Sequence, residues 1–157
     1  MIDAPAAGPS ERDVRAALAR IPDPELPVLS IVDLGVIHRV DVGPEGIEVA
    51  LLPTFVGCPA LDIMRSAIVE RLGDEFAQPI RVATTFAVPW TSDRISATGL
   101  DALRRAGIAP PAEPEDVRCP HCASADVVMD SAFGPTQCRS LFYCRGCRQP
   151  FEAMKSV

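Results

Sequence analysis

Residues 53–60 have the sequence PTFVGCPA and predict the turn from a strand into a helix around which the rest of the chain is arranged. The run before it, 47–52, is apolar apart from one glutamate, which is typical of a mostly buried strand. Pro53 ends that strand because proline cannot donate to a sheet ladder. From Pro59 onward, apolar residues recur at helical spacing until Gly73, a suitable C-terminal cap. The segment therefore predicts a strand, a short loop and a helix in direct succession.

Cys58 lies at the centre of this stretch, at or next to the predicted helix N-cap. Free backbone N–H groups and the positive end of the helix dipole favour an anion there. We therefore expect the thiol to ionise more readily than usual and to be a better nucleophile or metal ligand. The alternative is a small buried apolar side chain, which is the commoner fate of a free cysteine. Position alone leaves both interpretations open.

The composition indicates a cytoplasmic protein that binds neither nucleic acid nor a membrane. No apolar run approaches the roughly 20 residues of a membrane span, and the first residues lack the basic and apolar regions of a signal peptide. In a reducing compartment, the six cysteines favour metal binding or thiol chemistry over disulfides. The net charge of −6 argues against a phosphate backbone or an anionic membrane as the partner.

The first part of the chain predicts a helix followed by a rigid turn. A capping box at Ser10 begins the helix, and its apolar stripe ends at Ile21. Three prolines within 22–27 then exclude both helix and ladder. The two carboxylates of that turn, Asp23 and Glu25, could form a site, but we expect them to be simply solvated.

Strand signals follow the turn. Residues 31–34 and 36–42 supply a strand, and a turn at 43–46 connects it to 47–52 in a hairpin. After the next helix, residues 80–88 are rich in β-branched side chains, and the order strand, helix, strand implies a right-handed crossover with parallel pairing. The predicted fold class is thus α/β (α+β): a helix, a hairpin, a helix and a strand with a mixed sheet.

After the third predicted strand, the sequence predicts a loop, a short helix and a linker. The loop 89–93 holds the only tryptophan, Trp90, which either lines a site or a partner surface or covers the edge of the core. A short helix is expected from Thr98 to a cap at Gly107. Residues 110–117 are rich in proline and acidic side chains, which is typical of a linker between domains.

Two Cys-x2-Cys pairs near the C-terminus form the strongest motif, and they consist of Cys119, Cys122, Cys144 and Cys147. Each pair makes a tight turn that points two thiolates at one ion, and four sulfurs complete the closed tetrahedron of structural zinc. The apolar segments 127–129 and 141–143 predict the hairpin of a zinc ribbon, which needs the metal for much of its folding free energy. Iron or an iron–sulfur cluster is the alternative, because cysteine spacing alone does not distinguish the metals.

The remaining cysteine, Cys138, is expected to be buried in the ribbon hairpin, or else to be a second functional thiol. The segment from Ala109 onward has five basic against six acidic residues, before the negative charge of a zinc tetrathiolate is counted. We therefore expect the ribbon to dock a protein rather than a nucleic acid. The predicted regions are a disordered N-terminus (1–9), an α/β domain (10–109), a linker (110–117) and a zinc-ribbon domain (118–157).

The first two-thirds of the chain resemble the MIP18 family, also called DUF59. The motifs that carry this resemblance are Asp23-Pro24-Glu25, Asp33-Leu34-Gly35, Thr54 and Gly57-Cys58-Pro59. The narrower PaaD group, which comprises the D proteins of the multicomponent phenylacetyl-CoA epoxygenase, is similar over nearly the whole chain. The motifs for this second resemblance are Pro89-Trp90-Thr91-Ser92-Asp93, Gly107-Ile108-Ala109-Pro110-Pro111, Phe133-Gly134 and Pro150-Phe151.

The MIP18 resemblance implies a small α/β protein associated with iron–sulfur cluster assembly. The PaaD resemblance implies an accessory, non-catalytic role in aerobic phenylacetate degradation. By these resemblances Cys58 is the functional thiol or a transient ligand of iron or a cluster, and the supporting residues are Asp23, Glu25, Asp33 and Thr54. The ribbon cysteines hold structural zinc. The implied partners are the proteins of the phenylacetyl-CoA oxygenase and reductase system, with a homodimer as a further expectation.

Two alternative functions stay open at this level: a structural subunit of the oxygenase without metal transfer, and a general iron–sulfur cluster assembly factor. A thiol enzyme acting through Cys58 is disfavoured. Neither of the two histidines can be placed beside that thiol from the sequence, and no base with an orienting partner is evident.

Overall fold

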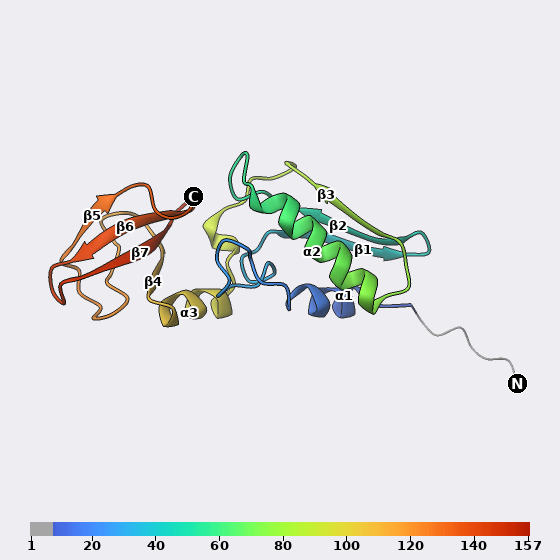
Figure 1. The fold of residues 1–157 in the computed structure, drawn as a ribbon, viewed down its shortest axis with the longest axis horizontal. Coiled ribbons are helices and arrows are strands. Elements are labelled where there is room, and N and C mark those ends of the chain that lie inside the picture. The colour runs from blue at the N-terminus through green and yellow to red at the C-terminus, as the bar shows by residue number, and fades with distance from the viewer. Residues whose placement is uncertain (1–7) are drawn as a thin grey trace, which may run out of the picture.

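The computed structural model describes residues 8–157 as two units side by side, an α/β unit and a smaller all-β unit, with helix α3 (Ala97–Arg105) between them (Figure 1). The predicted disordered segment, 1–9, lies outside the described residues except for its last two. No helix within residues 8–157 is long and apolar enough to cross a membrane.

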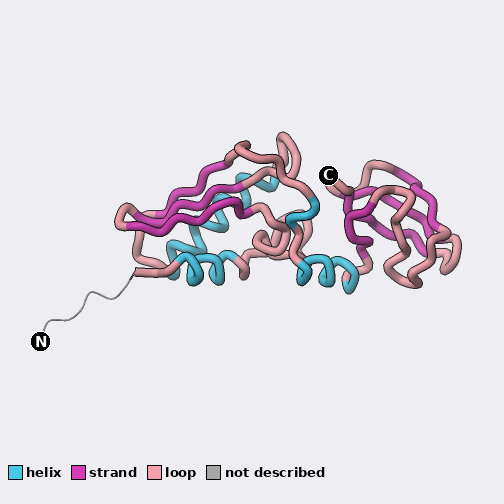
Figure 2. Tube along the Cα trace, turned by 180° about the vertical axis from the view of Figure 1, so that it is seen from behind, coloured by secondary structure: helices cyan, strands magenta, loops and turns pink. Residues whose placement is uncertain are grey.

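The α/β unit contains a mixed sheet of three strands. Strand β1 (Ile37–Gly43) pairs antiparallel with β2 (Gly46–Leu51), and β2 pairs parallel with β3 (Ile80–Thr84). Helices α1 (Glu11–Leu18) and α2 (Ala60–Glu75) pack together, and α2 lies in front of the strands in Figure 1 and behind them in Figure 2. The predicted hairpin, parallel crossover and fold class are therefore confirmed.

Helical periodicity accounts for the core of this unit. In α2 the residues at intervals of four, Ala60, Met64, Ile68 and Leu72, are all buried. In α1 the N-cap Ser10 accepts a hydrogen bond from the Asp13 backbone and completes the predicted capping box. Because burial of one aliphatic side chain contributes about 1.5–3 kcal/mol, this core provides the main stabilisation of the unit.

Several predicted boundaries are wrong, among them the N-cap of α3, which is Ser96 rather than Thr98. Helix α2 does not end at Gly73 but continues to Glu75, where the Phe76 N–H donates to the carbonyl of Leu72; an interior glycine costs a helix only roughly 1 kcal/mol. Strand β3 ends at Thr84 rather than at residue 88. Residues 31–34 form a turn rather than a strand, since the Leu34 N–H donates back to the carbonyl of Ser30 at 2.9 Å.

The second unit is a sheet of four strands in the order β4-β7-β6-β5. The predicted hairpin is present as β5 (Val127–Ser131) and β6 (Arg139–Cys144). Two further strands, β4 (Ile108–Ala112) and β7 (Gln149–Lys155), were not predicted; they pair parallel to each other, and β7 also pairs antiparallel with β6.

The predicted linker, 110–117, is wrong in its first three residues, because 110–112 belong to strand β4. Two prolines are tolerated there for two reasons: β4 is an edge strand, and the pairing with β7 shifts register between Ala109 and Ala112. The division of the chain into two separately folding domains stays a prediction.

The two units share a hydrophobic core. Ile108 of β4 and Met154 of β7 are buried within the core cluster of the α/β unit. At the other end of the junction, the backbone N–H of Ser92 donates to the carbonyl of Val157 at 3.1 Å. The ribbon is therefore packed against the first unit and not merely tethered to it.

Candidate functional site

The four cysteines of the two Cys-x2-Cys pairs come together at the far end of the ribbon. Their Sγ atoms all lie within 4.8 Å of one another. The Sγ atoms of Cys119 and Cys147 are 3.6 Å apart, as are those of Cys122 and Cys144. A tetrahedral ion with metal–sulfur bonds of about 2.3 Å requires sulfur–sulfur distances of about 3.8 Å, so the four thiols fit such an ion.

Tight turns aim the first pair of thiols. The Cys119 N–H donates to the carbonyl of Ser124 at 3.0 Å, and the Ala123 N–H donates to the carbonyl of Cys119 at 2.8 Å. Ala123 has a φ of 61°, the left-handed conformation that lets the chain reverse after Cys122. The turn thus points both sulfurs of this pair to the same side.

The second pair is held between two strands. Cys144 is the last residue of β6, and Cys147 comes shortly before β7. The Cys147 N–H donates to the Cys144 Sγ at 3.4 Å and lowers the pKa of Cys144 to about 7, whereas loss of solvation raises the pKa of Cys147 to about 12. A bound dication would favour the thiolate at both positions. Behind them, Phe142 and Phe151 stack with ring centroids 5.7 Å apart.

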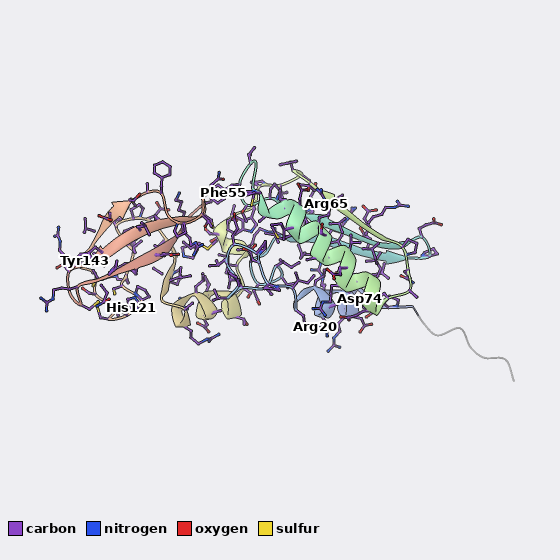
Figure 3. The ribbon with its side chains drawn as sticks, viewed as in Figure 1. Arg20, Phe55, Arg65, Asp74, His121 and Tyr143 are labelled. Atoms are coloured by element: carbon purple, nitrogen blue, oxygen red, sulfur yellow. The ribbon has the colours of Figure 1, made fainter. Side chains whose placement is uncertain are left out.

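Cys58 lies just before the N-cap of helix α2 and is not itself the cap. The N-cap is Pro59, and the Cys58 N–H donates to the carbonyl of Phe55 at 3.2 Å. The thiol is half-buried. Figure 3 labels Phe55 beside the N-terminal end of α2, near the junction with the ribbon.

The expectation that Cys58 ionises more readily than usual is wrong. Burial, as the main cause, raises the pKa of the thiol, and the charges of Glu25 and then Asp23 raise it further. Hydrogen bonds from the Ala60 backbone and the Thr54 side chain act in the opposite direction but do not prevail. The sequence shows only that a helix begins next to the thiol. The fold also buries the thiol and brings two carboxylates near enough to raise its pKa.

The turn that carries these carboxylates is ordered and partly buried. Asp23 is only 4% exposed, so the expectation that it is simply solvated is wrong. Its Oδ1 accepts hydrogen bonds from the backbone N–H groups of Glu25 at 3.0 Å and Leu26 at 2.7 Å. Burial raises the pKa of Asp23. Glu25 is half-buried. Asp23 therefore fixes the shape of the turn whose two carboxylates raise the pKa of Cys58.

The polar contacts of Asp33, which the resemblance gives as a supporting residue of Cys58, connect it to α3. Its Oδ1 accepts a hydrogen bond from the hydroxyl of Ser96, the N-cap of α3, at 2.5 Å. Its other oxygen accepts one from the Ser30 hydroxyl at 2.8 Å. The backbone carbonyl of Asp33 also accepts from the Ser96 N–H at 2.9 Å. We therefore interpret Asp33 as a residue that holds α3, and with it the ribbon, in place.

An apolar hollow of about 450 Å³ opens beside the Cys58 loop. Val56 is 89% exposed and Phe86 is 72% exposed at this surface. Trp90 forms part of the wall and is also buried in the core, so it both lines this surface and covers the core. The hollow is lined by Pro53, Thr54, Phe55, Val56, Phe86, Val88, Pro89, Trp90 and Val157.

Cys138 lies in the segment between β5 and β6, half-buried against the core of the α/β unit. Its Sγ is 3.1 Å from the Thr136 hydroxyl. It is therefore less enclosed by the ribbon than predicted. Within residues 8–157, the four ribbon cysteines are the one group of three or more potential metal ligands that lie close together.

Sequence reasoning missed Arg139, a ribbon residue that reaches the turn facing Cys58. Its Nη2 donates to the backbone carbonyl of Glu25 at 3.1 Å, across 114 positions of chain. Its side chain is only 11% exposed. No signal in the sequence distinguishes it from the other arginines of the ribbon.

Comparison with known proteins identifies both units. Residues 11–78 match the family described as "Iron-sulfur cluster assembly protein", and residues 105–155 match the "PaaD zinc beta ribbon domain". Among solved structures, the DUF59 domain from Bacillus anthracis is 27% identical and covers 59% of this chain and 90% of its own, with a TM-score of 0.56. A conserved hypothetical protein from Thermotoga maritima is 26% identical, covers 65% of this chain and 98% of its own, and has a TM-score of 0.53.

Two curated relatives share sequence with the chain. The Escherichia coli (strain K12) relative, named as the D component of a "Putative 1,2-phenylacetyl-CoA epoxidase", is 38% identical over 158 residues, which cover 96% of each chain. The Porphyromonas gingivalis protein named "Fe-S protein maturation auxiliary factor" is 32% identical over 89 residues, which cover 55% of this chain and 84% of that protein.

The fold and the cysteine cluster together define a DUF59-type iron–sulfur assembly domain joined to a metal-binding β-ribbon. The chain belongs to the PaaD family, that of the D components of phenylacetyl-CoA epoxidase.

Proposed function

We propose that this protein is a cytoplasmic, non-catalytic accessory factor of the phenylacetyl-CoA epoxidase system that assists maturation of an iron or iron–sulfur centre in the oxygenase or its reductase. Similarity over 96% of the chain to the Escherichia coli D component supports the link with that system. The match of residues 11–78 to the iron–sulfur assembly family supports the maturation role. A homodimer stays a prediction.

The observation that carries the proposal is the setting of Cys58. The thiol is half-buried in a loop at the edge of an exposed apolar hollow. A single thiolate cannot complete the coordination of iron or of a cluster, so further ligands are needed, and ligands lent by a client protein would make the binding transient. Exposed apolar surface of this kind marks contacts with another protein, which supports a protein client. The supporting residues in the proposal are Glu25, Asp23 and Thr54.

We assign Cys119, Cys122, Cys144 and Cys147 as ligands of a structural zinc ion. Zinc supplies no reaction here, because four thiolates leave no open coordination position. What it supplies is folding free energy for a sheet too small to bury a sufficient core of its own. The turns of the two Cys-x2-Cys pairs orient the four thiols. The stacked Phe142 and Phe151 exclude water from one side of the site.

A second candidate is a structural subunit of the oxygenase without metal transfer. The exposed apolar hollow favours it equally, because a permanent oxygenase component also needs a docking surface. The relative from Porphyromonas gingivalis favours a third, a general maturation factor. These candidates differ in whether replacement of Cys58 reduces epoxidase activity, and in how many other iron–sulfur enzymes lose activity with it.

The experiment is to replace Cys58 by serine in the sole copy of the protein and to measure epoxidase activity together with its metal content. Maturation predicts an oxygenase that is present but deficient in iron or cluster, while other iron–sulfur enzymes stay active. Full epoxidase activity with the Cys58→Ser protein would exclude the maturation role. Loss of activity in many iron–sulfur enzymes would instead support a general assembly factor.

A further inference from the structure

Arg139 connects the ribbon with the turn that faces Cys58 through three different hydrogen bonds. Its Nη2 donates to the carbonyl of Glu25 at 3.1 Å, its Nη1 donates to the carboxylate of Glu152 at 2.5 Å, and its Nε donates to the hydroxyl of Thr136 at 3.0 Å. The guanidinium group thus contacts two segments of the ribbon and one of the α/β unit.

These contacts hold the guanidinium in one place. The side chain is 11% exposed, and a charge this far from water is tolerated only when it is paired and hydrogen-bonded. The planar guanidinium group donates in fixed directions, so its three partners determine its orientation. The contact with Glu25 is therefore part of a defined network and not an incidental surface contact.

The ribbon strands connect this network with the metal-binding cysteines. Arg139 is the first residue of β6 and Cys144 is the last. Glu152 lies on β7, the strand that follows Cys147, and pairs with Leu141 of β6. An ion that fixes the two cysteines at one end of this pair of strands also limits how the strands move at the other end.

The segment before β6 is held as well. The Nζ of Lys155 donates to the carbonyl of Gln137 at 2.8 Å, and the Lys155 N–H donates to the carbonyl of Cys138 at 2.9 Å. The partner of Arg139 in this segment, Thr136, is therefore anchored to β7 through its neighbours. The ribbon contacts of the guanidinium group thus belong to the β6–β7 pair and to this anchored segment.

We propose that Arg139 is a positioning residue that couples metal occupancy of the ribbon to the conformation of the turn 23–26 beside Cys58. With metal bound, the β6–β7 pair is rigid and Arg139 holds the turn in place through the carbonyl of Glu25. Without metal, the strands loosen, the hydrogen bond to Glu25 is lost and Cys58 becomes more accessible. The inference rests on the proposed metal site, but it is independent of iron delivery to a client.

The test uses the full-length protein, with zinc bound and after zinc removal by a chelator, and follows two properties by mass spectrometry. The first is hydrogen exchange of the backbone in residues 22–29. The second is the rate at which Cys58 reacts with iodoacetamide at a fixed pH. The variants are Arg139→Met and Arg139→Lys. Arg104→Met is the matched control, because Arg104 is a largely exposed arginine that forms an ion pair with Asp101 on its own helix.

We expect zinc removal to raise both quantities in the wild-type protein by about threefold or more, within the range of couplings measured for residues in one network. Zinc-loaded Arg139→Met should already exchange residues 22–29 and react at Cys58 as fast as the zinc-free wild type. Removal of zinc from this variant should then change either rate little. Arg139→Lys, which keeps the charge but loses the fork of donors, lies between these two. Arg104→Met behaves as the wild type.

Two results overturn the inference. One is a zinc-loaded Arg139→Met protein with wild-type exchange and alkylation. The other is an equal response to zinc removal with and without Arg139. If Arg139→Met does not retain zinc, Glu152→Gln applies the same test from the other side of the ion pair, because it removes the carboxylate and keeps the size of the side chain. Because no client takes part, failure here leaves the maturation proposal to its own experiment.

Discussion

Trp90 donates its indole N–H to the backbone carbonyl of Leu34 at 3.0 Å, and this bond is one of a set that fixes the segment leading to the ribbon. The neighbouring carbonyl of Gly35 accepts from the Nε of Arg94 at 2.8 Å, and the Asp33 carboxylate accepts from the Ser96 hydroxyl. The Asp33-Leu34-Gly35 turn therefore holds helix α3, and it places the ribbon relative to the Cys58 loop.

Replacement of Gly35 by alanine should destabilise the protein. Gly35 has a φ of +77°, and a Cβ atom there would collide with the backbone of Arg94. We expect the free energy of unfolding to fall by about 2 kcal/mol or more, as measured by chemical denaturation. Gly73→Ala is the matched control, because its Cβ would meet open space within α2, and it should stabilise the protein by up to about 1 kcal/mol. Equal effects of the two changes would contradict this account.

Removal of one ribbon thiol should release the metal and loosen the ribbon. Cys144 is fully buried, so Cys144→Ser should lose zinc and raise hydrogen exchange in β6. The helices of the first unit should stay protected, because Cys144 belongs to the ribbon's own cluster of buried side chains and not to the core around those helices. Cys138→Ser is the control, since Cys138 lies outside the four-cysteine group, and it should retain about one zinc per chain. Zinc retained by Cys144→Ser would exclude the assigned ligand set.

Alkylation of Cys58 should have its midpoint at a higher pH than that of an ordinary cysteine. Burial raises its pKa, which makes the reactive thiolate scarcer at any given pH. Glu25→Gln removes the larger of the two charge effects and should lower the midpoint. The midpoint should still exceed the ordinary value, because burial is the main cause of the shift. Glu45→Gln, a change in the exposed hairpin turn, should leave the midpoint in place; a midpoint below the ordinary value in the wild type would contradict the assignment.

Asp23 should reduce stability at neutral pH. Its folded-state pKa is raised by burial, so the folded protein binds the proton more tightly than the unfolded chain does. Stability is therefore greatest below the unfolded-state pKa and falls as the pH rises through the folded-state pKa. Asp23→Asn retains an oxygen for the Leu26 N–H and carries no charge, so it should raise the Tm at pH 7. The gain should shrink as the pH is lowered into the usual range of aspartate; a gain that grows on acidification would refute this assignment.

Local patterns were sufficient to predict the hairpin, the crossover helix and the group of four cysteines. The burial of Met64, Ile68 and Leu72 follows from their spacing alone, and the two Cys-x2-Cys pairs determine their own turns. The end of α2 was missed because an interior glycine costs a helix only about 1 kcal/mol and so does not by itself end it. Strand β4 was missed because its two prolines are acceptable only at the edge of a sheet, and the sequence does not show which strand lies at an edge.

The setting of Cys58 could not be predicted either, because it depends on contacts between segments that are far apart in the sequence. Its pKa depends on burial and on Glu25, and the fold alone brings these together. The contact between Arg139 and Glu25 joins residues 114 positions apart, beyond the reach of any periodicity. The bond between Asp33 and Ser96 could not be predicted either, because it depends on how α3 packs.

The central claim is that Cys58 is a transient ligand for iron or a cluster, and it is tested most directly by anaerobic reconstitution with iron and sulfide. Zinc, iron and acid-labile sulfide per chain are measured in the wild type and in Cys58→Ser. We predict about one zinc per chain in both proteins and uptake of iron and sulfide only in the wild type. Equal uptake of iron and sulfide in the two proteins, with zinc unchanged, would contradict the claim and leave docking to the oxygenase as the function.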